Sequence, residues 1–150
     1  MGDRQRVLIL CTGNSARSQM AEGWLRAHAG DRFEVFSAGS RPSGQVHPGA
    51  IQAMAEIGID ISRHTSKSMM QFIGQPFDYV LTVCDAAAEE CPVFPGPAKR
   101  IHHGFPDPAK APPDTQPAEF RRVRDDIARW LADLFAIDLS GYPEKPGQGA

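Results

Sequence analysis

Short apolar runs alternate with helical periodicities along the first half of the chain. Residues 6–10 consist of Arg6 followed by four branched apolar side chains, which is typical of a strand buried on both faces of a parallel sheet. Residues 18–28 repeat apolar side chains every three or four positions and predict an amphipathic helix. The pattern then predicts a strand over 33–37, a helix that begins at Pro48, and a buried strand over 77–83.

The second half of the chain is divided between a proline-rich segment and one long helix. Eight of the 13 prolines fall within 85–117, so we expect a loop-rich stretch there with one short strand at 99–102. Residues 115–139 predict a long amphipathic helix, and 69–73 predict a short helical turn. The predicted core positions of these segments are Met69, Met70, Phe120, Val123, Ile127, Trp130, Leu131 and Leu134.

The order of these elements predicts an α/β fold, a three-layer sandwich around a central four-stranded parallel sheet. We expect one domain over residues 1–140 and a flexible, Gly- and Pro-rich tail over 141–150. Parallel sheets with right-handed crossovers place their ligand site at the carboxyl ends of the strands. Cys11, Ser37 and Cys84 all map to that edge.

Composition narrows the class of protein. The length of 150 residues with 41% hydrophobic content suits one domain, and the net charge of −2 gives no reason to expect a nucleic acid or membrane partner. The apolar run at 6–10 is too short for a signal peptide, and Arg6 stands where a myristoylation signal needs Ser or Thr. We therefore expect a monomeric cytoplasmic protein. Its three cysteines then favour reactive thiols or metal ligands over structural disulfides.

A cysteine and an arginine, Cys11 and Arg17, stand six positions apart between the first strand and the first helix. Backbone N–H groups of such a loop can converge on one anion, and the helix N-terminus adds partial positive charge. Arg17 would add a bidentate fork, and the same field favours a thiolate at Cys11, to which Ser18 can donate a hydrogen bond. The predicted oxyanion-binding residues are Thr12, Gly13, Asn14, Ser15, Ala16 and Arg17.

This spacing alone is also compatible with a buried cysteine at a strand end and an unrelated surface arginine. The position of the loop between strand and helix favours an active site, as do Gly13, Asn14 and Ser15 within it. Glycine allows a tight curl, and asparagine tolerates unusual backbone angles.

Residues 7–23, VLILCTGNSARSQMAEG, resemble the opening of the low-molecular-weight tyrosine phosphatase superfamily, and specifically its thioredoxin-coupled arsenate reductase branch. Phosphatases of this superfamily usually have proline after the Arg-Ser pair, whereas this chain has Gln19, as the reductases do. The similarity covers nearly the whole chain and continues through residues 37–39, 59–65, 84–91 and 103–108.

The resemblance implies reduction of arsenate to arsenite by a relay of three thiols, with no cofactor or metal. Cys11 attacks arsenate, Cys84 attacks Cys11 and releases arsenite, and Cys91 takes over the disulfide, which thioredoxin then reduces. Asp107 matches the family's general acid. Phosphate and sulfate are expected to compete with arsenate.

Several alternatives remain open at this point. A low-molecular-weight phosphatase would use the same loop and leave Cys84 and Cys91 idle, as core and surface residues. A zinc site of these thiols with His102 or His103 lacks a paired Cys-x2-Cys spacing. A non-catalytic oxyanion sensor would need a partner surface or a DNA-binding element, which the sequence does not indicate. A phosphate-loop NTPase is excluded because its glycine-lysine motif is absent from the sequence.

Some reductases of this branch bind potassium beside the anion loop, at positions that match Asn14, Glu22 and Lys67. A lysine in place of an acid repels a monovalent cation, and its ammonium group could pair with Glu22 instead. We therefore expect no potassium requirement.

Overall fold

The computed structural model describes residues 4–91, 94 and 97–140, and the expected tail lies outside these residues. A four-stranded parallel sheet with strand order β2-β1-β3-β4 forms the centre, as predicted. Its strands are β1 (Gln5–Cys11), β2 (Phe33–Gly39), β3 (Tyr79–Thr82) and β4 (Lys99–His102). The helices are α1 (Arg17–Ala29), α2 (Pro48–Ala55), α3 (Asp85–Glu90) and α4 (Gln116–Phe135), with short 3₁₀ helices η1 (Met69–Phe72) and η2 (Pro108–Lys110).

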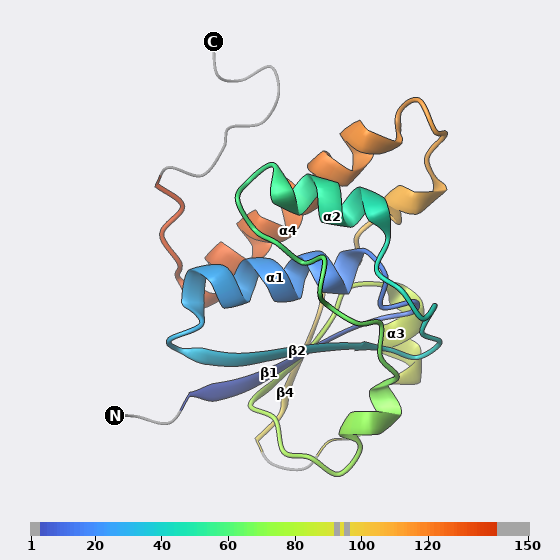
Figure 1. Cartoon of the computed structure of the whole chain (residues 1–150). Helices are drawn as coiled ribbons and strands as arrows, with labels where there is room; N and C mark the ends of the chain where they lie inside the picture. The colour runs from blue at the N-terminus through green and yellow to red at the C-terminus, as the bar shows by residue number, and fades with distance from the viewer. Residues whose placement is uncertain (1–3, 92–93, 95–96, 141–150) are drawn as a thin grey trace.

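The long helices gather on one face of the sheet (Figure 1). Helices α1 and α4 pack against each other, and α2 packs on both of them. The short helix η1 lies on the opposite face, and α3 stands at the carboxyl end of the strands (Figure 1). The sheet is therefore enclosed between two layers, which confirms the predicted α/β sandwich.

The central strand β1 explains where the site lies. Its side chains from Val7 to Cys11 are all buried, because strands pair on both of its edges and helices and loops cover both of its faces. Cys11 is paired with Gly39 at the end of β2, and the N–H of Val83, just past β3, donates to the carbonyl of Leu10. The carboxyl ends of three strands thus meet at one edge.

Helix α4 differs from its prediction at its end and in its core face. It stops at Phe135 because Ala136 adopts a left-handed conformation with φ of 53°. Trp130 and Leu134 pack against the core but are only half-buried. Arg124, in contrast, is buried and donates to the carbonyl of Ala53 on α2. A helix with such charged positions does not suit lipid, and among the described helices none has the length and apolar character needed to cross a bilayer.

The predicted burial of Met70 is wrong, since its relative exposure is 67%. Helix η1 is a single 3₁₀ turn, which turns only one side chain, Phe72, fully inward. Met69 packs partly against the core, so half of that prediction is confirmed.

Candidate active site

The loop between β1 and α1 curls around the sulfur of Cys11. Asn14 has a φ of 47°, in the left-handed region that asparagine tolerates. Its backbone N–H donates to Cys11 Sγ at 3.2 Å. Ala16 is the N-cap of α1 and has no polar side chain to engage the first N–H groups of the helix. The loop therefore directs the N–H of Asn14 toward the sulfur and leaves the first N–H groups of α1 without a side-chain cap.

A chain of hydrogen bonds connects Glu22 with Ser18 and Cys11. The amide of Asn14 donates to Ser18 Oγ at 2.8 Å and to Ser37 Oγ at 2.9 Å, and Ser37 donates to the carboxylate of Glu22 at 2.5 Å. Ser18 thus accepts from the amide. An ionised Cys11 can only accept, so the hydroxyl of Ser18, 2.8 Å from Cys11 Sγ, donates to it when the thiolate forms. A hydrogen bond donated by a hydroxyl to this sulfur stabilises the thiolate form of the cysteine.

The space in front of Cys11 is a small cavity of about 70 Å³. Arg17 borders it, and its guanidinium donates to the carbonyl of Phe105 at 3.0 Å and lies 3.8 Å from Asp107 Oδ2. The other carboxylate oxygen of Asp107 accepts from the N–H of Ala109, which fixes the side chain at the start of η2. The residues lining the cavity are Cys11, Gly13, Ser15, Ala16, Arg17, Asp107 and Ala109.

The two further cysteines cap the two ends of α3. Cys84 is buried, and its sulfur lies 3.2 Å from the hydroxyl of Thr12 in the anion loop. Cys91 is half-buried at the other end, where burial raises the pKa of its thiol and the nearby charge of Arg100 opposes that rise. No disulfide joins any of the three cysteines. The structure thus brings Cys84 to the anion loop and keeps Cys91 one short helix away.

Residues 6–140 match the family described as low molecular weight phosphotyrosine protein phosphatase. The chain belongs to this family. The arsenate reductase of Halalkalibacterium halodurans is 49% identical to it over 129 residues, which are 85% of this chain and 92% of that protein. The predicted family and its arsenate reductase branch are therefore confirmed.

Solved structures agree with this assignment. An arsenate reductase in the phosphate binding state superposes with a TM-score of 0.68 at 32% identity, covering 88% of this chain and 97% of that chain. A thioredoxin-dependent arsenate reductase of Corynebacterium glutamicum shares the fold with a TM-score of 0.67 at 24% identity, covering 90% of this chain and 61% of that chain.

Charged side chains surround the position beside Asn14, Glu22 and Lys67 where the family resemblance suggested a potassium site. Glu22 is buried and pairs with Arg26 at 2.6 Å, so Arg26 takes the place we had expected Lys67 to occupy. The ammonium of Lys67 donates instead to the carbonyl of Thr65 at 2.8 Å. Burial lowers the pKa of Lys67, and the charge of Glu22 opposes this shift. The absence of a potassium requirement stays a prediction.

Sequence reasoning did not predict that Gln19 braces the anion loop. Its amide nitrogen donates to the backbone carbonyl of Asn14 at 3.1 Å, to the side-chain oxygen of Asn14 at 3.0 Å, and to the carbonyl of Thr65 at 2.9 Å. It therefore holds the strained residue of the loop against the segment before η1. The available signal was that Ser18, Gln19 and Glu22 put three polar residues on one helix turn beside Met20 and Ala21.

Gly39→Ala is expected to disorganise the anion loop. A Cβ at this position would lie 2.4 Å from the carbonyl oxygen of Thr12 and 3.0 Å from the backbone nitrogen of Asn14. Because both are backbone atoms, the loop itself must move, at a cost of about 1 to 3 kcal/mol in unfolding free energy. We expect at least a roughly tenfold loss of activity, because a small displacement of positioned groups is costly. Urea unfolding and steady-state kinetics test this, and unchanged values in both would refute the close contact.

Proposed function

We propose that this protein reduces arsenate to arsenite through Cys11, Cys84 and Cys91, and that thioredoxin regenerates it. The observation that supports this most directly is the contact of Cys84 with the anion loop through Thr12, at 3.2 Å. A phosphatase needs one thiol at such a loop, whereas a thiol reductase needs a second that can reach the first.

In the first step of the proposed reaction, the thiolate of Cys11 attacks arsenate and forms an S–As bond. Arg17 and the loop N–H groups stabilise the charge on the remaining oxygens, and Asp107 gives a proton to the departing hydroxyl, which leaves as water. In the second step, Cys84 attacks Cys11 Sγ. The S–As electron pair stays on arsenic, which is reduced from As(V) to As(III), and arsenite leaves as the Cys11–Cys84 disulfide forms.

In the third step Cys91 attacks the sulfur of Cys84 and releases Cys11 as a thiolate, so that the disulfide joins Cys84 and Cys91. A reduced dithiol protein then takes over that disulfide by the same exchange chemistry. Thioredoxin is our proposal for this partner, because the fold is shared with a thioredoxin-dependent arsenate reductase. All three cysteines must begin as thiols, which suits the reducing cytoplasm, and one chain supplies every group required, so we propose a monomer.

The size and walls of the cavity favour a small oxyanion over an aryl phosphate. A volume of about 70 Å³ is well below the several hundred Å³ typical of pockets for larger organic ligands. Its lining residues carry no aromatic ring against which a phenyl group could stack. A larger cavity of about 380 Å³ lies between α2 and α4, and no cysteine lines it. Phosphatase activity is therefore the weaker second candidate.

A coupled assay with arsenate, thioredoxin, thioredoxin reductase and NADPH tests the proposal. We expect one NADPH to be oxidised for each arsenite released, with phosphate and sulfate as competitive inhibitors. Hydrolysis of aryl phosphates without arsenite formation would instead identify a phosphatase. Stoichiometric anion binding without turnover would identify an oxyanion sensor.

Asp107→Asn is expected to slow arsenite formation by about 100-fold with little change in anion affinity, because the leaving hydroxyl loses its proton donor. Asparagine caps a helical turn as well as aspartate does, so the bond to Ala109 and the local fold should persist. Single-turnover kinetics measure the rate. The exposed neighbour Asp114 provides the control, since Asp114→Asn should be silent. An Asp107→Asn protein with a normal rate would remove Asp107 from the mechanism.

A further inference from the structure

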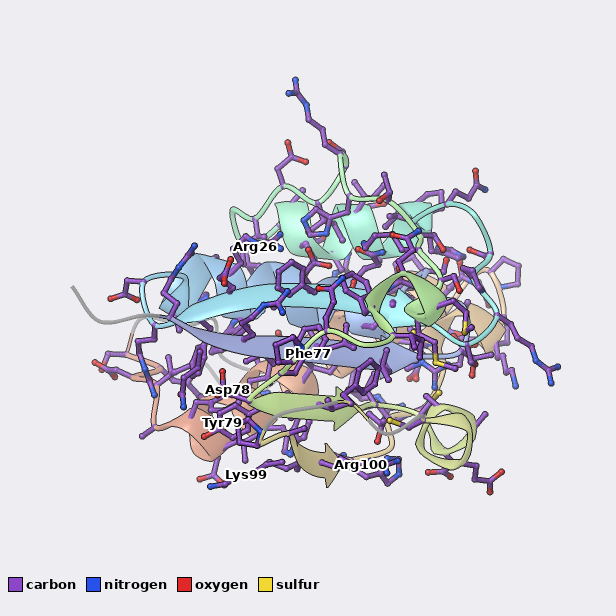
Figure 2. All side chains as sticks on the ribbon, turned by 90° about the horizontal axis from the view of Figure 1, so that it is seen from below. Arg26, Phe77, Asp78, Tyr79, Lys99 and Arg100 are labelled. Carbon is purple, nitrogen blue, oxygen red and sulfur yellow. The ribbon has the colours of Figure 1, made fainter. Side chains whose placement is uncertain are left out.

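Helix α3 is tied at both ends to the edge strand β4. At its start, Asp85 Oδ1 lies 2.9 Å from His102 Nε2. At its end, the guanidinium of Arg100 donates to the carbonyl of Cys91 at 3.1 Å. Figure 2 labels Arg100 on β4, with α3 beyond the carboxyl end of the strand. The segment between the two cysteines is therefore held at two points.

Both contacts come from one face of β4, because Arg100 and His102 are two positions apart. The ring of His102 is itself fixed, since Thr82 Oγ1 on β3 lies 2.8 Å from Nδ1. An ionised carboxylate can only accept, so Nε2 carries the hydrogen toward Asp85. The chain also passes close by, because a Cβ on Gly104 would lie 2.9 Å from Asp85 Oδ1. These contacts hold both ends of α3 against β4.

The helical form of this segment is incompatible with a disulfide between its ends. Cys84 and Cys91 are seven positions apart, and a helical rise of about 1.5 Å per residue would separate their Cα atoms by about 10 Å. A disulfide requires a Cα separation of roughly 4.4 to 6.8 Å, so α3 must unwind before the bond can form. A helix of six residues is unstable by itself. Its tertiary contacts therefore decide how easily it opens.

Building on the thiol relay proposed above, we propose that Arg100 and His102 form a two-point clamp that holds the segment 84–91 in its helical dithiol form. The Cys84–Cys91 disulfide forms only when both contacts break. The clamp thus opposes oxidation of the resting enzyme and favours return to the starting form after reduction. Burial in the same state raises the pKa of the Cys91 thiol, although the charge and hydrogen bonding of Arg100 oppose that rise.

The test uses the Cys11→Ser protein, whose remaining cysteines are Cys84 and Cys91. Mixtures of reduced and oxidised glutathione set the redox poise. Oxidised glutathione accepts two electrons and both thiol protons as the intramolecular disulfide forms, and leaves as two glutathione thiols. Alkylation followed by mass spectrometry gives the disulfide fraction at each ratio, and hence the equilibrium constant.

We expect Arg100→Gln and His102→Gln each to raise this equilibrium constant about threefold, as suits partly exposed charged contacts. The double variant should raise it about tenfold if the two ends act independently. Lys99→Gln and His103→Gln are matched controls on the same strand and just after it, and neither should change it. Asp85→Ala removes the accepting oxygen of the first contact from the side of the exposed helix residue and should repeat the effect of His102→Gln without disturbing the core.

Equal equilibrium constants in the parent and in all the variants of Arg100, His102 and Asp85 would overturn the clamp while leaving the relay intact. An equal rise of the equilibrium constant in the Lys99→Gln control would also overturn the clamp. The effect would then come from the loss of any positive charge on β4 and not from the two contacts. A parent protein that forms no Cys84–Cys91 disulfide at any glutathione ratio would overturn the relay, and the clamp with it. Faster amide hydrogen exchange in α3 of the clamp variants would support the clamp independently.

Discussion

Replacement of Cys84 by serine is expected to abolish arsenite release, by at least about 10³-fold, because the attacking thiol of the second step is removed. The adduct of Cys11 with arsenate should still form, since the anion loop and Arg17 are unchanged. Serine has nearly the same shape as cysteine and can keep the contact with Thr12, so the loop should retain its geometry. Any slow hydrolysis of p-nitrophenyl phosphate by the wild-type protein would need only the first thiol and should be unchanged in this variant.

The Cys91→Ser protein is the informative comparison. It retains the first two steps, so it should release one equivalent of arsenite in a burst and then stop. Mass spectrometry should find the Cys11–Cys84 disulfide in the stopped enzyme. The Cys84→Ser protein should show neither the burst nor any disulfide.

Other outcomes separate the two candidate functions. Sustained arsenite production by Cys84→Ser would eliminate the relay and require an external thiol to attack the adduct directly. Full phosphatase turnover in the wild-type protein and in both variants, with no arsenite from any of them, would identify the protein as a phosphatase. These results differ in product, so product analysis alone decides between them.

The parts of the fold that local patterns determine were predicted well. The continuous apolar run before Cys11 reflects burial on both faces of a sheet, and that requirement is visible in the four consecutive residues 7–10. The anion loop follows from it, because a strand, a short polar loop and a helix in sequence must bring Cys11 and Arg17 to one edge. Asp107 could not be found this way, and only the family resemblance pointed to it, because its segment has no periodicity.

The partial exposure of Trp130 has its cause in tertiary contacts. Trp130 fits the apolar stripe of α4, but it packs on His103 and Phe105, with ring centroids 5.4 and 5.6 Å away, and so stays partly exposed. Those partners lie in the proline-rich segment, whose path no hydrophobic pattern predicts. The hydrogen-bond chain from Glu22 to Cys11 was hidden for a similar reason, since it requires knowing that α1 faces the end of β2, where Ser37 lies.

Arg17→Lys is expected to lower kcat/KM for arsenate by about 10³-fold although the charge is retained. Arg17 can offer two parallel N–H groups to the anion while its geometry is fixed by Phe105 and by the neighbouring Asp107. A lysine presents a mobile point charge in place of that planar fork, so stabilisation of the transition state should suffer more than ground-state binding. We therefore expect kcat to fall more than KM rises.

Alkylation of Cys11 by iodoacetamide gives a second measurement for Arg17→Lys. Arsenate or phosphate should protect the wild-type thiol at low concentration and protect the variant only at much higher concentration. Arg63→Lys, at an exposed position outside the cavity, is the matched control and should behave as wild type. If Arg17→Lys kept both its kcat and its protection by anions, the anion would be held by the loop N–H groups and the helix N-terminus alone.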